Sequence, residues 1–178
     1  SRLSIGISAF ATFSGQGVHE HADKLSLILF ANDHLWLPDI EAKTSAEHAF
    51  SSVTQAQLNR QTLCHNTLLV DGRSQRFPGQ RLDLLEFTNA PGLKRVTIGD
   101  RQGRLYEGVR QLRTLIVSEG YVVDFFQAAS PAPHEFAWLT HVDGEATGGS
   151  VRATNTVAWP AGAPWSYLRE PRGGKAEG

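Results

Sequence analysis

The sequence predicts an all-β protein, an antiparallel β-sandwich, from three observations. Short apolar runs recur from Arg81 to Val142 without helical periodicity. Turn-forming residues separate these runs at the spacing typical of a sandwich. The chain has 178 residues, of which 40% are hydrophobic, and this is enough to bury one core.

The first 80 residues predict four strands. The segment Ala31-Asn32-Asp33 is a hairpin signal, and Asp71-Gly72 is a strong turn dipeptide. The polar stretch Glu41–Arg60 predicts a loop or a short helix. The four predicted strands are Ile5–Phe13, Lys24–Phe30, His34–Leu37 and Thr67–Val70.

The remainder of the chain continues the same pattern. Thr147–Trp159 predicts one or two weaker strands, so we expect a sandwich domain over residues 1–160. Residues 161–178 are rich in Pro and Gly, and we expect a poorly ordered tail there. The five predicted strands of this half are Arg81–Asn89, Leu93–Ile98, Val109–Val117, Tyr121–Ala128 and Glu135–Val142.

Composition excludes several classes of function. A net charge of -1 creates no field that would attract a polyanion, so we expect no nucleic-acid partner. No apolar run is long enough to span a bilayer, and Cys64 is the one cysteine, which excludes an internal disulfide. The chain contains no methionine and begins abruptly on a strand-like run, so we expect it to be a piece of a longer polypeptide.

Five of the seven histidines lie between Gly17 and Gln75, beside strand-like runs. His19 and His21 are two apart in an extended segment, so their side chains share a face. Both are candidate ligands of one metal; alternatively, one binds the metal and the other turns towards a substrate. Asp39 and His65 arrive from separate strands, and imidazole and carboxylate groups together are typical ligands of zinc. The competing interpretation is that each histidine is a hydrogen-bonded structural residue.

Three motifs in order carry a resemblance to a known family: HEHADKLSL, then Leu-Pro-Asp, then RQTLCHNTLLVDGRSQ. Together with the later EGVRQLRTLIVSEGYVVDFFQA and HEFAWLTHVDGE, they resemble the heparinase II/III-like polysaccharide lyases, which include heparin and alginate lyases. The resemblance covers roughly Ile5–Ala146. It implies that this chain is the supersandwich-type C-terminal β-sandwich of an enzyme whose N-terminal domain is an α/α toroid.

The resemblance also implies roles for particular residues. The zinc of the family corresponds to ligands at His21, Asp39 and His65, and the cleft-facing catalytic histidine corresponds to His19. Arg60 and Asn66 belong to the same motif and are assigned supporting roles in substrate binding. The sequence departs from the family at Glu41, where many relatives have glycine. It also has no tyrosine before the HNT motif, where His48 is the candidate substitute as a proton carrier.

The family's chemistry is β-elimination at a uronate sugar of a polysaccharide or oligosaccharide. The resemblance implies a periplasmic protein whose toroid carries most of the catalytic groups, so we expect the isolated chain to be inactive. The main alternative is a non-catalytic carbohydrate-binding or interaction sandwich with a structural metal or histidine cluster, in which tryptophans stack on sugars. A small cupin-like metalloenzyme with two histidines and one carboxylate is a third hypothesis, and the HNT motif argues against it.

Overall fold

The computed structural model describes residues 6–14, 19–39, 51–144, 155–156, 160–168 and 172–173. The regular secondary structure of the described part consists almost entirely of antiparallel strands, which confirms the predicted all-β class. Among these residues no helix is long and apolar enough to cross a membrane. His48, Glu41 and most of Thr147–Trp159, on which the sequence made predictions, lie outside the described residues.

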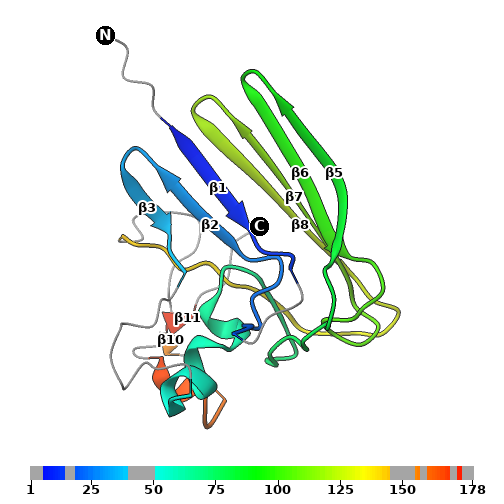
Figure 1. The fold of residues 1–178 in the computed structure, drawn as a ribbon. Coiled ribbons are helices and arrows are strands. Elements are labelled where there is room, and N and C mark those ends of the chain that lie inside the picture. Colours follow the sequence, from blue (N-terminus) through cyan, green and yellow to red (C-terminus); the bar gives the residue numbers. More distant parts are fainter. Residues whose placement is uncertain are drawn as a thin grey trace.

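Two sheets form the sandwich, and Figure 1 shows them as neighbouring layers. The first has the order β1-β2-β3, and the second has the order β5-β6-β7-β8. The strands of the first sheet are β1 (Ile7–Ala11), β2 (Leu27–Ala31) and β3 (His34–Leu37). Those of the second are β5 (Asp83–Ala90), β6 (Leu93–Asp100), β7 (Arg110–Ser118) and β8 (Tyr121–Ala129).

Shorter elements complete the described fold. The strand β4 (Leu68–Val70) pairs with β9 (Phe136–Trp138), and β10 (Asn155–Thr156) pairs with β11 (Arg172–Gly173). Three helical turns are also present: η2 (Gln55–Asn59, a π-helical turn), η3 (Thr62–Cys64) and η4 (Trp165–Tyr167). The elements η4 and β11 lie within residues 161–178. The expectation that this segment is a poorly ordered tail stays a prediction.

Turn chemistry sets the hairpins as the sequence predicts. Asn32 and Asp33 adopt φ of 55° and 58°, the left-handed pair that a two-residue hairpin between β2 and β3 requires. Asp71 and Gly72 do the same after β4, with φ of 51° and 67°. Because these residues tolerate positive φ better than others do, the local sequence is sufficient to place both turns.

The core lies between the sheets and the loops at one end of them. Its fully buried members include Leu25, Ile98, Leu105 and Val109, each 0% exposed, and Phe13 and Phe126 pack against it. Two predicted strands are shorter than expected at this end. Lys24 and Leu25 form a turn ahead of β2, and β9 stops at Trp138, so His141 lies in irregular chain. Both departures leave irregular backbone beside the predicted site.

Candidate functional site

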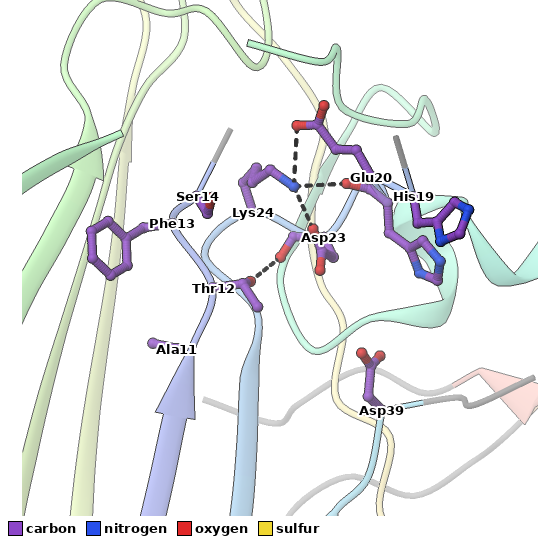
Figure 2. Close-up of a pocket in the computed structure, with 10 residues that line it drawn as sticks. Ala11, Thr12, Phe13, Ser14, His19, Glu20, Asp23, Lys24 and Asp39 are labelled. Carbon is purple, nitrogen blue, oxygen red and sulfur yellow. Dashed lines mark hydrogen bonds and ion pairs between the residues drawn. The ribbon is translucent and has the colours of Figure 1, made fainter. Parts of the chain in front are cut away.

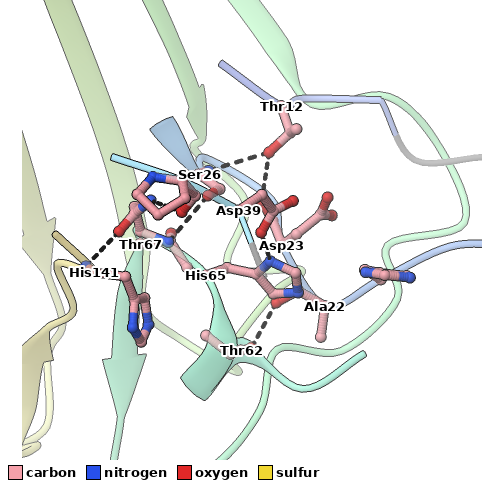
Figure 3. A network of polar contacts seen from close by, with 12 residues as sticks. Thr12, Ala22, Asp23, Ser26, Asp39, Thr62, His65, Thr67 and His141 are labelled. Atoms are coloured by element: carbon pink, nitrogen blue, oxygen red, sulfur yellow. Dashed lines mark hydrogen bonds and ion pairs between the residues drawn. The ribbon is translucent and has the colours of Figure 1, made fainter. Parts of the chain in front are cut away.

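The predicted ligands His65 and Asp39 are in direct contact. Nδ1 of His65 lies 2.5 Å from Oδ1 of Asp39, and Figure 3 shows the two side chains pointing toward each other. His65 is 0% exposed, whereas the Asp39 side chain is 25% exposed. A contact this short is a charge-assisted hydrogen bond, which holds the imidazole in one orientation.

His21 completes the predicted group. Its ring centroid lies 5.4 Å from that of His65, with the planes tilted by 47°. Burial lowers the pKa of His21 and the neighbouring His65 ring lowers it further, while Asp23 and Asp39 oppose the shift. A lowered pKa keeps this imidazole neutral, which is the state that ligates a metal.

The chemistry of the three side chains fits a zinc ion. Nε2 of His65 is buried and has no hydrogen-bond partner among the described residues, although an unpaired buried polar atom is costly. As the side chains stand, no group of three or more His, Cys, Asp or Glu residues in the described ranges is arranged to hold a metal ion. The arrangement therefore supplies suitable donor atoms without a completed coordination shell.

A cleft of about 750 Å³ lies beside this group, and Figure 2 shows its wall running from Phe13 to His19. His19 is exposed and lines the cleft together with His21 and Asp39. The same wall carries the ammonium group of Lys24. The structure thus places three predicted residues, His19, His21 and Asp39, on one cavity, with His65 buried behind Asp39.

Lys24 is a component of this wall that the sequence analysis did not single out. Its side chain is 6% exposed, and Nζ lies 2.6 Å from Oδ1 of Asp23 and 3.4 Å from Oε1 of Glu20. Nζ also donates to the carbonyl of His21 at 2.9 Å. The ammonium is therefore fully engaged by the loop that carries the two histidines, and it stabilises that loop instead of facing a ligand.

Asn66, predicted to bind substrate, is 1% exposed and joins three backbone segments. Its Nδ2 donates to the carbonyls of Leu27 and Pro38, both at 2.9 Å, and its Oδ1 accepts the backbone N–H of His141 at 2.6 Å. Because Pro38 precedes Asp39 and Asn66 follows His65, these bonds place the carboxylate against the imidazole. The geometry assigns Asn66 a positioning role, and substrate binding by it stays a prediction.

Arg60, the other predicted substrate-binding residue, lies next to the histidine loop. Its Nε donates to the carbonyl of Glu20 at 3.3 Å, and its guanidinium lies 5.9 Å from the ring centroid of Phe77. The backbone carbonyl of Arg60 accepts the N–H of Ala22 at 3.0 Å. Arg60 thus lies beside the loop that carries His21, and substrate binding by it stays a prediction.

A second layer of buried polar side chains supports the loops. Oγ1 of Thr62 donates to the carbonyl of Ala22 at 2.7 Å, which Figure 3 shows, and accepts the N–H of Gln75 at 2.8 Å. Gln75 in turn pairs with both the N–H and the carbonyl of Lys24, at 2.8 and 2.9 Å. These residues could not be found from the sequence, since each acts on a backbone group far along the chain.

Together, the fold and the cleft define a β-sandwich domain that presents histidine and carboxylate side chains at one end of its sheets. A family model described as "Heparinase II/III-like, C-terminal" matches residues 8–175, nearly the whole chain. The chain therefore belongs to the heparinase II/III-like family and corresponds to its C-terminal domain, as its motifs predicted.

Solved structures show the same fold. The Heparinase III-BT4657 gene product aligns with a TM-score of 0.66 at 15% identity, over 83% of this chain and 24% of that one. The heparan sulfate lyase HepC from Pedobacter heparinus aligns with a TM-score of 0.54 at 17% identity, over 72% of this chain and 19% of that one. The chain thus spans about a quarter or less of these structures. The search of curated proteins found no match.

Proposed function

We propose that this chain is the part of a polysaccharide lyase that forms one wall of the catalytic cleft and holds a zinc ion. The observation that carries the proposal is the meeting of His21, Asp39 and His65, which come from three separate segments, beside a cleft lined by His19. A purely structural histidine cluster would not need to leave Nε2 of His65 buried and unpartnered.

His21, Asp39 and His65 are the residues that would hold the ion. When bound, zinc would order this face of the cleft and lend it positive charge. Zinc binding is favoured because burial lowers the pKa of His21 and so keeps its imidazole neutral. The contact with Asp39 also orients the His65 ring. The hydrogen bonds of Asn66 and Lys24 keep the ligand-bearing segments together before any ion arrives.

The reaction we propose is β-elimination at a uronate sugar. A base removes the proton on C5, the resulting electron pair forms the C4–C5 double bond, and the glycosidic bond at O4 breaks with its electrons on oxygen. His19 is exposed on the cleft and is the residue of this chain proposed to exchange a proton with the substrate. Arg60 and Asn66 are proposed to support the sugar's position directly or through the loops.

The rest of the machinery is proposed to come from an α/α toroid in the same polypeptide, because the relatives' chains are several times longer than this domain. The isolated chain is then expected to produce no unsaturated uronate from alginate or heparan fragments, measured by ultraviolet absorbance. Robust elimination by this chain alone would contradict the division of labour between the two domains.

Metal titration tests the site itself. Purified chain stripped of metal should take up one equivalent of zinc, followed by calorimetry and by elemental analysis after dialysis. His65→Ala should abolish the binding, whereas His34→Ala, a change at an exposed histidine on β3, should retain it. A wild-type chain that is folded and takes up no zinc would refute the metal site.

A further inference from the structure

We propose that Arg81 binds a carboxylate of an acidic sugar at the end of the cleft opposite His19. The guanidinium of Arg81 is exposed and lies 5.8 Å from the ring centroid of Phe13, a residue of the cleft wall. In Figure 2 the labelled Phe13 and His19 stand at opposite ends of this wall, with Lys24 and Asp23 between them. The inference rests on the proposed function and adds a residue that binds substrate.

The backbone of this segment is held firmly while the side chain remains accessible. The N–H of Leu82 donates to the carbonyl of Phe13 at 2.9 Å, and Leu82 is 2% exposed. Phe13 itself packs against the core cluster. A guanidinium stacked on an anchored ring loses little further freedom on binding, so it is pre-organised for a ligand.

Arg81 differs from most arginines of the four-stranded sheet and its loops in its ion pairing. Four of the arginines there pair with acids: Arg95 with Glu86, Arg101 with Asp83, Arg104 with Asp100 and Arg113 with Asp124. Among the described residues, no ion pair involves Arg81. Its charge is therefore available to a ligand.

The cleft needs such a group, because its own ammonium is already committed. Lys24 is buried between Asp23 and Glu20 and offers no exposed charge to an anion. An acidic saccharide that lies along this wall meets the carboxylates of Glu20, Asp23 and Asp39. A guanidinium at the flank offsets that repulsion, and its planar pair of N–H groups matches a carboxylate in bidentate fashion.

The experiment pairs a change in the protein with a change in the ligand. The probes are an unsulfated oligouronate tetrasaccharide and the same tetrasaccharide with its carboxylates reduced to alcohols, titrated into the chain by calorimetry or by NMR. We expect Arg81→Ala to lower the affinity for the acidic probe about tenfold, the typical loss of a hydrogen-bonded charged pair. The affinity for the reduced probe should fall less than twofold. Arg81→Lys should fall between wild type and alanine.

The matched control is Arg110→Ala on β7. Arg110 is also exposed and forms no ion pair within the described residues, so its removal changes net charge by the same amount. It should leave both affinities within about twofold of wild type, since a remote exposed charge is screened by salt. Thermal melting of each variant checks that it is folded.

The possible outcomes separate the inference from the proposed function. The carboxylate subsite is refuted if Arg81→Ala binds the acidic probe as tightly as wild type does, or if the substitution lowers the affinities for both probes equally. The lyase proposal stands in either case. If folded wild-type chain binds neither probe, the proposed role of this cleft wall fails, and the subsite with it. If Arg81→Ala lowers the affinity for the acidic probe alone and Arg110→Ala does not, both the carboxylate subsite and the proposed role of the cleft wall are supported.

Discussion

The four-stranded sheet and the site loops satisfy their backbone groups in different ways. In the sheet, β5 to β8 pair antiparallel along their lengths, with one shift of register between Leu84 and Glu86. Most backbone groups there are therefore bonded in a ladder of neighbouring hydrogen bonds. In the loops of residues 19–26 and 60–67, single side chains supply the partners that a strand would have supplied. The loops should therefore be sensitive to individual substitutions that the sheet would tolerate.

One residue joins the two regions. Arg113 on β7 is 1% exposed, and its Nη1 donates to the carbonyls of Leu25 and Asn66 while the rest of its guanidinium binds Asp124 on β8. Leu25 needs such support, because it is a buried leucine with φ of 62°, a strained conformation for a residue with a Cβ. Through Arg113 the regular sheet supports the irregular site.

The largest effect is expected at this junction. Arg113→Met leaves Asp124 without its buried partner and removes the side-chain donor of the Leu25 and Asn66 carbonyls, of which Asn66 keeps the N–H of Leu27. The change should lower the free energy of unfolding by about 3–5 kcal/mol. Arg95→Met breaks a sheet ion pair whose side chains are 46% and 39% exposed and should cost about 1 kcal/mol or less. Urea denaturation measures both, and equal losses would contradict the special role of Arg113.

Asn66→Asp should have the next largest effect. The new side chain has nearly the same shape but presents oxygens where Nδ2 donated to the carbonyls of Leu27 and Pro38, so a loss of about 3 kcal/mol is expected. The NMR signals of His65 should also change, because the contact with Asp39 loses its anchor. Asn89→Asp, at an exposed position of β5, is the control and should change stability by about 0.5 kcal/mol or less. Similar losses of unfolding free energy in both variants would argue against a role of Asn66 in holding the backbone segments together.

A smaller difference is expected between threonines of the two regions. Thr62→Val removes a hydroxyl that both donates and accepts, leaving the Ala22 carbonyl and the Gln75 N–H unpaired, at a cost of about 2 kcal/mol. In the sheet, the hydroxyl groups of Thr97 and Thr114 bond to each other at 2.9 Å and have no further partner among the described residues. Replacing both by valine should be nearly neutral, because no partner is left behind. Thermal unfolding compares the two variants, and a costly double change would show that the sheet is no more tolerant than the loops.

The smallest effect concerns pH. Burial lowers the pKa of His141, whose Nε2 lies 2.8 Å from the carbonyl of Leu63. A histidine with a lowered pKa binds more protons when unfolded, so its contribution to stability is present above pH 6.5 and is lost as pH falls through the folded-state pKa. Unfolding free energies measured from pH 7.5 to 5 should fall, and His141→Gln should reduce that slope. If the unfolding free energy of the variant depends on pH as steeply as that of wild type, His141 is not the source of the pH dependence.

Much of the sheet framework follows from short-range sequence signals. The register of β5 to β8 and the hairpins at Asn32-Asp33 and Asp71-Gly72 arise from alternation and from residues that accept positive φ, so both are visible in a few consecutive residues. The ends of β2 and β9 were less predictable. There Lys24 and His141 form hydrogen bonds with distant segments that take the place of the strand ladder.

The amino-acid sequence alone determined the β class and the family, and it pointed to His19, His21 and Asp39 at the cleft, because motif order and strand alternation are visible along the chain. The way these residues are held depended on folding. Asn66 donates a hydrogen bond to the carbonyl of Pro38, and Lys24 forms an ion pair with Asp23 of its own loop. Arg81 lies over the ring of Phe13 and has no acidic partner among the described residues. Contacts between residues tens of positions apart depend on which surfaces pack together, and no local pattern encodes that choice.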